Sequence, residues 1–268
     1  MTATFLDQVR THTLRQVEEA HTSGAAERAR QAKPRHRPGV FAEALQAPGM
    51  SVIAEIKRAS PSAGAIRADL DPVALARRYA AGGAAAISVL TEPIWFKGSL
   101  DDLGAVANAV ELPVLRKDFV LDPVQIDMAV AHGAAAVLLI AAFVTPDQLT
   151  TLVAYAHARG LDALVEIFSE EELEAALAAG TQLLGVNARN LKTLEVDRGA
   201  VLRLGPALAQ HLEAGEVELL VAESGIQRQE HAQAAWDVGY RAALVGEALV
   251  RHADPATLLR ELSLQGAT

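Results

Sequence analysis

Residues 52–62 read Val52-Ile53-Ala54-Glu55-Ile56-Lys57-Arg58-Ala59-Ser60-Pro61-Ser62, an apolar run that carries a glutamate and a lysine two positions apart. The run is typical of a buried strand, and side chains two positions apart on a strand leave it on the same face. Glu55 and Lys57 are therefore predicted to stand side by side, just before a loop that begins at Ser60. Because burying an unpaired ion is costly, the two form either a structural ion pair or part of a functional site.

From residue 51 onward, apolar segments typical of buried parallel strands alternate with segments of helical periodicity. We predict eight strands, at 51–57, 84–90, 113–117, 134–140, 163–167, 182–187, 218–223 and 241–245. Helices are predicted at 72–81, 100–110, 123–131, 146–159, 170–179, 198–210, 228–238 and 255–262. A helix end, a glycine, small residues and a strand recur in this order through the chain, which supports the count.

Eight such units predict a closed (β/α)8 barrel, the TIM barrel of the α/β class, and the length of 268 residues fits one such domain over 1–268. The barrel proper is expected at 51–268, after an N-terminal helical extension at 1–45 whose first helix spans 3–20. The polar, basic residues 25–39 are interpreted as a solvated connector. An open doubly wound sheet is the alternative, but no GxGxxG motif follows the first strand.

Composition excludes several classes of function. The net charge of −9 argues against a nucleic-acid-binding protein, and no apolar run is long enough for a membrane span. No signal peptide is recognisable, and the absence of cysteine excludes disulfides and thiolate chemistry, so we expect a cytoplasmic protein. The eight histidines show no metal-binding spacing, which predicts no metal site. A monomer is expected, with a dimer left open.

Ionisable side chains gather at the carboxyl ends of the predicted strands, where barrel enzymes have their active sites. These are Glu55, Lys57, Lys117, Glu166, Arg189 and Glu223, three cations facing three carboxylates. Their concentration at one rim favours a catalytic site over structural ion pairs. Lysine can lose its proton when buried whereas arginine cannot, so Lys57 and Lys117 point to a transferable proton.

Two loops at the same rim indicate a phosphate site. One is 223–226, Glu-Ser-Gly-Ile, after the seventh strand, and the other is 246–249, Gly-Glu-Ala-Leu, which opens a helical turn after the eighth. Backbone N–H groups at a glycine-containing loop and at a helix N-terminus bind dianions readily. The loops after strands seven and eight are the recurrent phosphate position of this fold, and ordinary tight turns are the alternative interpretation.

Through these motifs the chain resembles the indole-3-glycerol phosphate synthase family, in its monofunctional bacterial form. The matching motifs follow in order between about residues 40 and 250, at 53–62, 86–91 with 96–99, 112–119, 164–166, 185–193, 222–226 and 244–247. The resemblance implies closure of an indole ring in tryptophan biosynthesis by a carboxy-lyase that uses no cofactor or metal. The implied substrate is 1-(2-carboxyphenylamino)-1-deoxyribulose 5-phosphate, which yields indole-3-glycerol phosphate, carbon dioxide and water.

The resemblance also implies roles for the charged residues. By the family pattern Lys117 is the general acid that protonates the ribulose carbonyl, held cationic by neighbours such as Glu55. Glu166 is assigned as the base of the dehydration. Lys57 is assigned as its second acid, or as a group that only orients the substrate carboxylate.

The remaining candidates are implied to bind the substrate. Asn187 and Glu223 fix hydroxyl and amine groups, while Arg189 and Ser60 meet the carboxylate. The aromatic ring and the phosphate are expected to lie against Phe96, Phe119, Ser224, Gly225, Leu244, Gly246 and Glu247. For Phe119, packing in the core is an alternative role.

Rival functions remain at this point. Phosphoribosylanthranilate isomerase would require a Cys–Asp pair, and this chain has no cysteine. The tryptophan synthase α chain uses two carboxylates without the Lys57 and Lys117 pair. A non-catalytic barrel that only binds phosphate would not need two strand-end lysines facing three glutamates.

Overall fold

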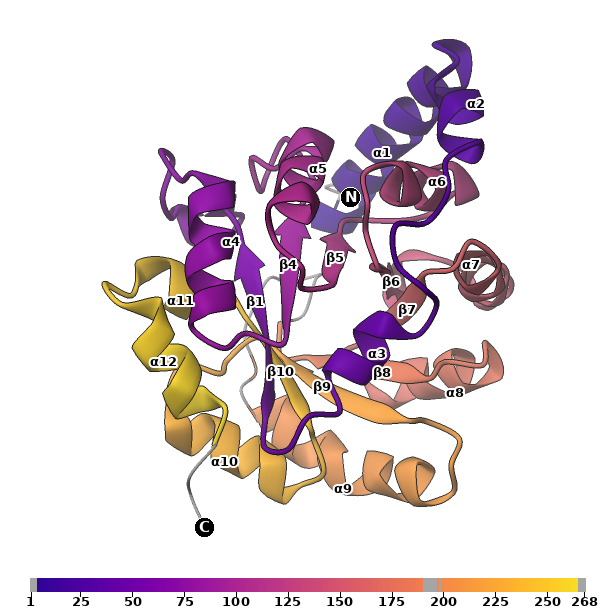
Figure 1. The fold of residues 1–268 in the computed structure, drawn as a ribbon. Helices are drawn as coiled ribbons and strands as arrows, with labels where there is room; N and C mark the ends of the chain where they lie inside the picture. Colours follow the sequence, from indigo (N-terminus) through magenta and orange to yellow (C-terminus); the bar gives the residue numbers. More distant parts are fainter. Residues whose placement is uncertain (1–3, 190–196, 198, 265–268) are drawn as a thin grey trace.

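The computed structural model describes residues 4–189, 197 and 199–264, and at its centre is a closed barrel of eight parallel strands (Figure 1). Around the barrel the order is β1-β10-β9-β8-β7-β6-β5-β4, so each strand pairs with its neighbours in sequence and the last closes on the first. The strands are β1 (Ser51–Ile56), β4 (Ala86–Leu90), β5 (Val114–Lys117), β6 (Ala136–Ile140), β7 (Asp162–Ile167), β8 (Leu183–Asn187), β9 (Leu219–Glu223) and β10 (Ala242–Val245). The barrel prediction is confirmed, and the open sheet is excluded.

The observed strands lie inside the predicted ones, except that β7 begins one residue earlier, at Asp162. Their nearly continuous apolar sequence follows from two layers of burial. On β1, Ile53 points into the barrel interior with Leu115 and Leu164. The alternate residues Val52 and Ala54 belong to the layer between strands and helices. Both faces of the strands are therefore buried away from water. An ionised side chain on such a strand needs a partner of opposite charge to offset the cost of its burial.

Six outer helices begin at the predicted residue, and those predicted from 198 and 228 begin one residue later. A short helix also follows the eighth strand, where a helical turn was expected. The outer helices are α4 (Pro72–Ala81), α5 (Leu100–Ala109), α6 (Pro123–Ala131), α7 (Pro146–Ala158), α8 (Glu170–Ala178), α9 (Gly199–Glu213), α10 (Gln229–Asp237), α11 (Glu247–Arg251) and α12 (Pro255–Leu262). In four of them an N-cap side chain accepts backbone N–H bonds directly before a proline at the first helical position, as at Asp71, Asp122, Thr145 and Asp254. Among the described residues, no helix is both long and apolar enough to cross a bilayer.

The segment before β1 forms α1 (Phe5–Thr22), α2 (Ala25–Arg30) and α3 (Val40–Ala44), with α1 and α2 next to α6 in Figure 1. The interpretation of residues 25–39 as a solvated connector is wrong for α2. Ala26 and Ala29, three positions apart, are buried on one face of this helix. Ala26 packs in a cluster with Val17 and Val124 of α6. The charged side chains of the segment stay exposed, which made it resemble a connector in sequence.

A short helix closes the end of the barrel opposite the strand carboxyl ends. The Asp162 carboxylate, at the start of β7, accepts hydrogen bonds from the backbone N–H groups of Gly39 (3.2 Å), Phe41 (3.0 Å) and Ala42 (3.0 Å) at the beginning of α3. Phe41 and Leu45 are fully buried with the inward-facing barrel residues. Within the described residues, the cavity of the barrel opens at the other mouth.

Candidate active site

A cavity of about 270 Å³ opens at the carboxyl ends of the strands. The catalytic and substrate-binding candidates from the sequence all line it: Glu55, Lys57, Ser60, Phe96, Lys117, Phe119, Glu166, Asn187, Arg189, Glu223, Ser224, Gly225, Leu244, Gly246 and Glu247. Parallel strands of one barrel end at the same rim, which brings residues from distant parts of the chain together.

Glu55 and Lys57 form an ion pair at the end of β1, with 2.5 Å between Glu55 Oε1 and Lys57 Nζ. The Glu55 side chain is buried and that of Lys57 is partly exposed to the cavity. Gly246 packs against both, because a Cβ at this position would overlap the Glu55 carboxyl group and lie 2.8 Å from Lys57 Nζ. The ion pair therefore occupies the space that a side chain at position 246 would enter.

Lys117 of β5 lies between two carboxylates, one from β7, two strands away, and one from β9, on the opposite side of the barrel. Its Nζ is 2.7 Å from Glu223 Oε2 and 3.2 Å from Glu166 Oε2, and both glutamates are buried. Burial alone would lower the pKa of Lys117, but the attraction of Glu223, Glu166 and Glu55 outweighs it and raises the pKa. Glu55 acts at longer range, because its direct partner is Lys57. Lys117 is an ammonium at neutral pH.

Burial raises the pKa of Glu223 to about 8, against the attraction of Lys117 and with help from the negative charge of Glu166. One ammonium cannot neutralise two buried carboxyl groups. The Glu166 and Glu223 pair therefore retains a proton more easily than an exposed glutamate does. The pocket for the Glu223 side chain exists because position 185 on β8 is glycine. A Cβ there would overlap the Glu223 carboxyl group.

Near β8 the cavity wall is polar, and it includes one contact that the sequence did not predict, between Arg189 and Ser62. Asn187 Oδ1 accepts the backbone N–H of Arg189 (2.9 Å), which fixes the turn that carries the arginine. The Arg189 guanidinium donates to Ser62 Oγ (2.7 Å), a residue to which the sequence analysis assigned no role. Ser60 Oγ accepts the backbone N–H of Ala63 (3.2 Å) in the small hairpin β2 (Ala59–Ser60) and β3 (Gly64–Ala65). Positions 190–193 of the matching motif lie outside the described residues.

Aromatic rings form the opposite wall. Phe119 is both buried and part of the cavity lining, with its ring centroid 6.3 Å from Phe96 and 5.4 Å from Phe143. Phe119 therefore packs against neighbouring aromatic rings and also lines the cavity. Phe5 of α1 also lines the cavity, 6.0 Å from Phe119 and 5.5 Å from Trp95. Sequence reasoning missed Phe5, because nothing local indicates that α1 lies over the mouth of the barrel.

Two loops form the end of the cavity next to β9 and β10. Ser224 and Gly225 have φ values of 63° and 79°, a left-handed turn in which a serine is uncommon. Gly246 precedes α11, whose first residue Glu247 accepts a hydrogen bond from Arg251 Nε (2.9 Å). Because a carboxylate repels a phosphate, Glu247 could serve an anion only through its backbone N–H.

The lining also includes further apolar residues, of which Ile226 was already part of the predicted loop 223–226. Leu138 and Ile140 of β6 and Ile226 after β9 face the cavity. The alternation along β6 could have indicated Leu138 and Ile140, since residues two apart on this strand share the inward face.

Comparison with known proteins gives one consistent family. A family model described as "Indole-3-glycerol phosphate synthase" matches residues 6–262. The chain is 49% identical over 223 residues to the indole-3-glycerol phosphate synthase of Mycolicibacterium gilvum (strain PYR-GCK), covering 83% of this chain and 80% of that protein. It is 48% identical over 226 residues to the protein of the same name from Rhodococcus jostii (strain RHA1), covering 84% and 82%.

Solved structures of lower identity share the fold. A crystal structure of 3-hexulose-6-phosphate synthase has a TM-score of 0.61 at 20% identity, over 80% of this chain and 98% of that one. Tryptophan synthase subunit alpha from Legionella pneumophila str. Paris has a TM-score of 0.58 at 15% identity, over 83% and 96%. At such identities the likeness concerns the barrel architecture alone.

Proposed function

The chain belongs to the indole-3-glycerol phosphate synthase family, and on this premise we propose how its own residues carry out the family reaction. The enzyme is a carboxy-lyase of tryptophan biosynthesis that closes the indole ring of a phosphorylated substrate. This membership removes the isomerase, the tryptophan synthase α chain and the non-catalytic barrel as alternatives. The observation that carries the proposed mechanism is the Lys117 ammonium held between Glu166 and Glu223 inside the cavity.

Lys117 is the general acid of ring closure. As the aromatic carbon that bears the carboxylate attacks the ribulose carbonyl, a proton passes from Lys117 Nζ to the carbonyl oxygen, which becomes a hydroxyl group. The raised pKa of Lys117 supports this role, since it keeps the proton in place until the oxygen gains charge. An alkoxide is a much stronger base than an amine, so transfer is favourable at that moment. Carbon dioxide then leaves, and the electrons of the broken bond restore the aromatic ring without another acid.

Dehydration requires a base and a second acid. Glu166 accepts the proton from the carbon next to the hydroxyl-bearing carbon, while Lys57 protonates the departing hydroxyl group. The two lysines stand in separate ion pairs, Lys57 with Glu55 and Lys117 with Glu166 and Glu223, which supports two separate proton donors. The alternative, in which Lys57 only orients the substrate, predicts a different kinetic pattern.

Residues on three sides of the cavity bind the substrate. The Arg189 guanidinium donates to Ser62 Oγ. It is suited to the anthranilate carboxylate because its N–H donors match the two carboxylate oxygens. Phe96 and Phe119 hold the ring in a dry environment, which strengthens the electrostatic effects of the neighbouring charges. Asn187 and Glu223 orient hydroxyl and amine groups. The phosphate meets the backbone of the loops that hold Ser224, Gly225, Gly246 and Glu247, beside Leu244.

The roles of the two lysines are separable by following carbon dioxide release and indole fluorescence in the same reaction. Lys117→Met should suppress both signals, because ring closure precedes decarboxylation. Lys57→Met should suppress indole formation more strongly than carbon dioxide release if Lys57 is the second acid. Equal losses of both signals in Lys57→Met would assign it to substrate orientation. Undiminished signals in Lys117→Met would refute its assignment as the acid.

We also propose that the enzyme acts as a monomer in the cytoplasm. The candidate catalytic and substrate-binding residues of one chain all line the same cavity, which supports the monomer. A phosphorylated intermediate stays within the compartment where it is made, because a charged group does not cross an apolar bilayer unaided. Sedimentation equilibrium and cell fractionation test the two statements.

A further inference from the structure

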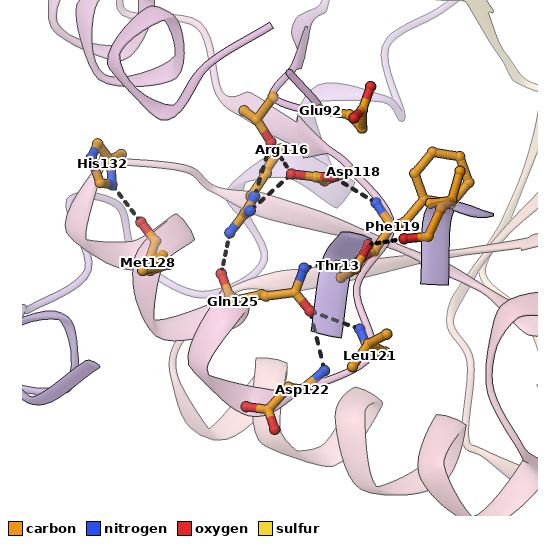
Figure 2. Close-up of polar contacts among 12 residues, drawn as sticks. Thr13, Glu92, Arg116, Asp118, Phe119, Leu121, Asp122, Gln125, Met128 and His132 are labelled. Carbon is orange, nitrogen blue, oxygen red and sulfur yellow. Dashed lines mark hydrogen bonds and ion pairs between the residues drawn. The ribbon is translucent and has the colours of Figure 1, made fainter. Parts of the chain in front are cut away.

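A buried polar cluster flanks Lys117 at the end of β5, and Figure 2 shows the Arg116 and Asp118 side chains of this cluster directed toward each other. Arg116 and Asp118 flank Lys117 in sequence, and alternation along the strand sends their side chains the other way. Arg116 is 4% and Asp118 7% exposed, and Arg116 NH2 lies 2.9 Å from Asp118 Oδ2. Two charges are thus buried next to the proposed acid, and Asp118 also contributes to the lining of the cavity.

Thr91, directly after β4, ties this ion pair to the backbone of Lys117. Its hydroxyl accepts from Arg116 Nε (3.1 Å) and donates to Asp118 Oδ2. Its backbone N–H donates to the carbonyl oxygen of Lys117 (3.1 Å). A hydroxyl group has one proton to donate, and that proton is committed here, so the orientation of the three side chains is fixed.

The same cluster fixes the chain on the other side of Lys117. Asp118 Oδ1 accepts the backbone N–H of Phe119 (2.8 Å), and Gln125 Nε2 of α6 donates to the Phe119 carbonyl oxygen (2.9 Å). Arg116 NH1 donates to the Gln125 carbonyl oxygen (2.5 Å). The backbone groups of Lys117 and Phe119 are therefore held by hydrogen bonds from or to Thr91, Asp118 and Gln125. The Arg116 side chain is anchored on the Gln125 backbone of α6 (Figure 2).

Stability alone is a weak reason for such an arrangement, because a buried ion pair can often be replaced by apolar residues without loss. We propose that Thr91, Arg116 and Asp118 are positioning residues that set the height and direction of the Lys117 ammonium. This rests on the proposed role of Lys117 as the general acid. Its Nζ must keep both glutamates in contact and still reach the substrate carbonyl oxygen. A misplacement of about 1 Å in such a group costs on the order of 10²-fold in rate.

The test compares Thr91→Val with Thr91→Ser. Valine keeps the branched shape and removes the hydroxyl, whereas serine keeps the hydroxyl and removes only a methyl group. Thr91→Val should lower kcat by roughly 10- to 100-fold with little change in KM, and Thr91→Ser should stay within a few-fold of the parent. Tyr155→Phe is the control, because it removes the hydroxyl bonded at 3.0 Å to the buried Asp127, which lies outside the cavity lining. It should leave kcat unchanged.

A double variant separates positioning from a general structural effect. If Thr91 acts through Lys117, Thr91→Val should not lower kcat further in a Lys117→Met background. A further drop in the double variant, equal losses for valine and serine, or a kcat of Thr91→Val within twofold of the parent would each overturn the inference. Near-parental activity of Lys117→Met alone would instead overturn the proposed acid. Asp118→Asn, measured in the same way, replaces Thr91→Val if that variant does not fold.

Discussion

Replacing Lys117 with methionine tests the centre of the site, because stability and catalysis should respond differently. The change removes the Lys117 ammonium, whose Nζ lies 3.2 Å from Glu166 Oε2 and 2.7 Å from Glu223 Oε2 of two buried carboxylates. Breaking a buried ion pair by removing one partner costs about 3–5 kcal/mol, since the remaining charge has lost its compensation. Removal of a general acid costs on the order of 10²–10⁴ in rate.

The double variant Lys117→Met/Glu223→Gln distinguishes the two effects. At pH 9, above the raised pKa of Glu223, both carboxyl groups of the parent are largely ionised. Neutralising Glu223 then leaves Glu166 as the single carboxylate of the former trio, so most of the lost stability should return at that pH. The rate should not return, because glutamine and methionine supply no acidic proton. Urea unfolding gives the free energy of unfolding, and the appearance of indole fluorescence gives kcat. A kcat of Lys117→Met within a few-fold of the parent, or recovery of kcat together with stability in the double variant, would refute the reasoning.

Three further measurements test other parts of the site. Arg189→Ala should mainly raise KM, because its guanidinium is assigned to the substrate carboxylate; steady-state kinetics showing an unchanged KM would remove it from the binding residues. Gly185→Ala should lower kcat by displacing the Glu223 carboxyl group, and a parental rate would mean that this carboxyl group moves freely. A carboxyl group with a raised pKa in the folded state favours folding most at low pH. The free energy of unfolding should therefore fall as pH rises from 4.5 to about 8, more steeply in the parent than in Glu223→Gln; equal slopes in urea unfolding would contradict the raised pKa.

Local sequence patterns were sufficient to predict the barrel. Apolar runs of strand length, glycine at helix ends and proline at helix starts are set by backbone geometry and burial, and these are properties of short segments. The rim position of the charged residues followed as well, because parallel strands connected by helices all end on one side. Residues 25–30 were misinterpreted, because the burial of Ala26 and Ala29 depends on a helix nearly a hundred positions later in the chain.

The amino-acid sequence by itself determined the barrel and the rim at which the charged side chains gather. Only the tertiary structure decided which of them meet: Lys117 reaches Glu166 and Glu223 across the barrel, while Glu55 pairs with Lys57. It also decided that Phe5 reaches the cavity and that Thr91 holds the residues beside Lys117. The physical reason is that strand periodicity fixes the face on which a side chain leaves, whereas its partner depends on the curvature of the closed sheet and on where distant segments pack.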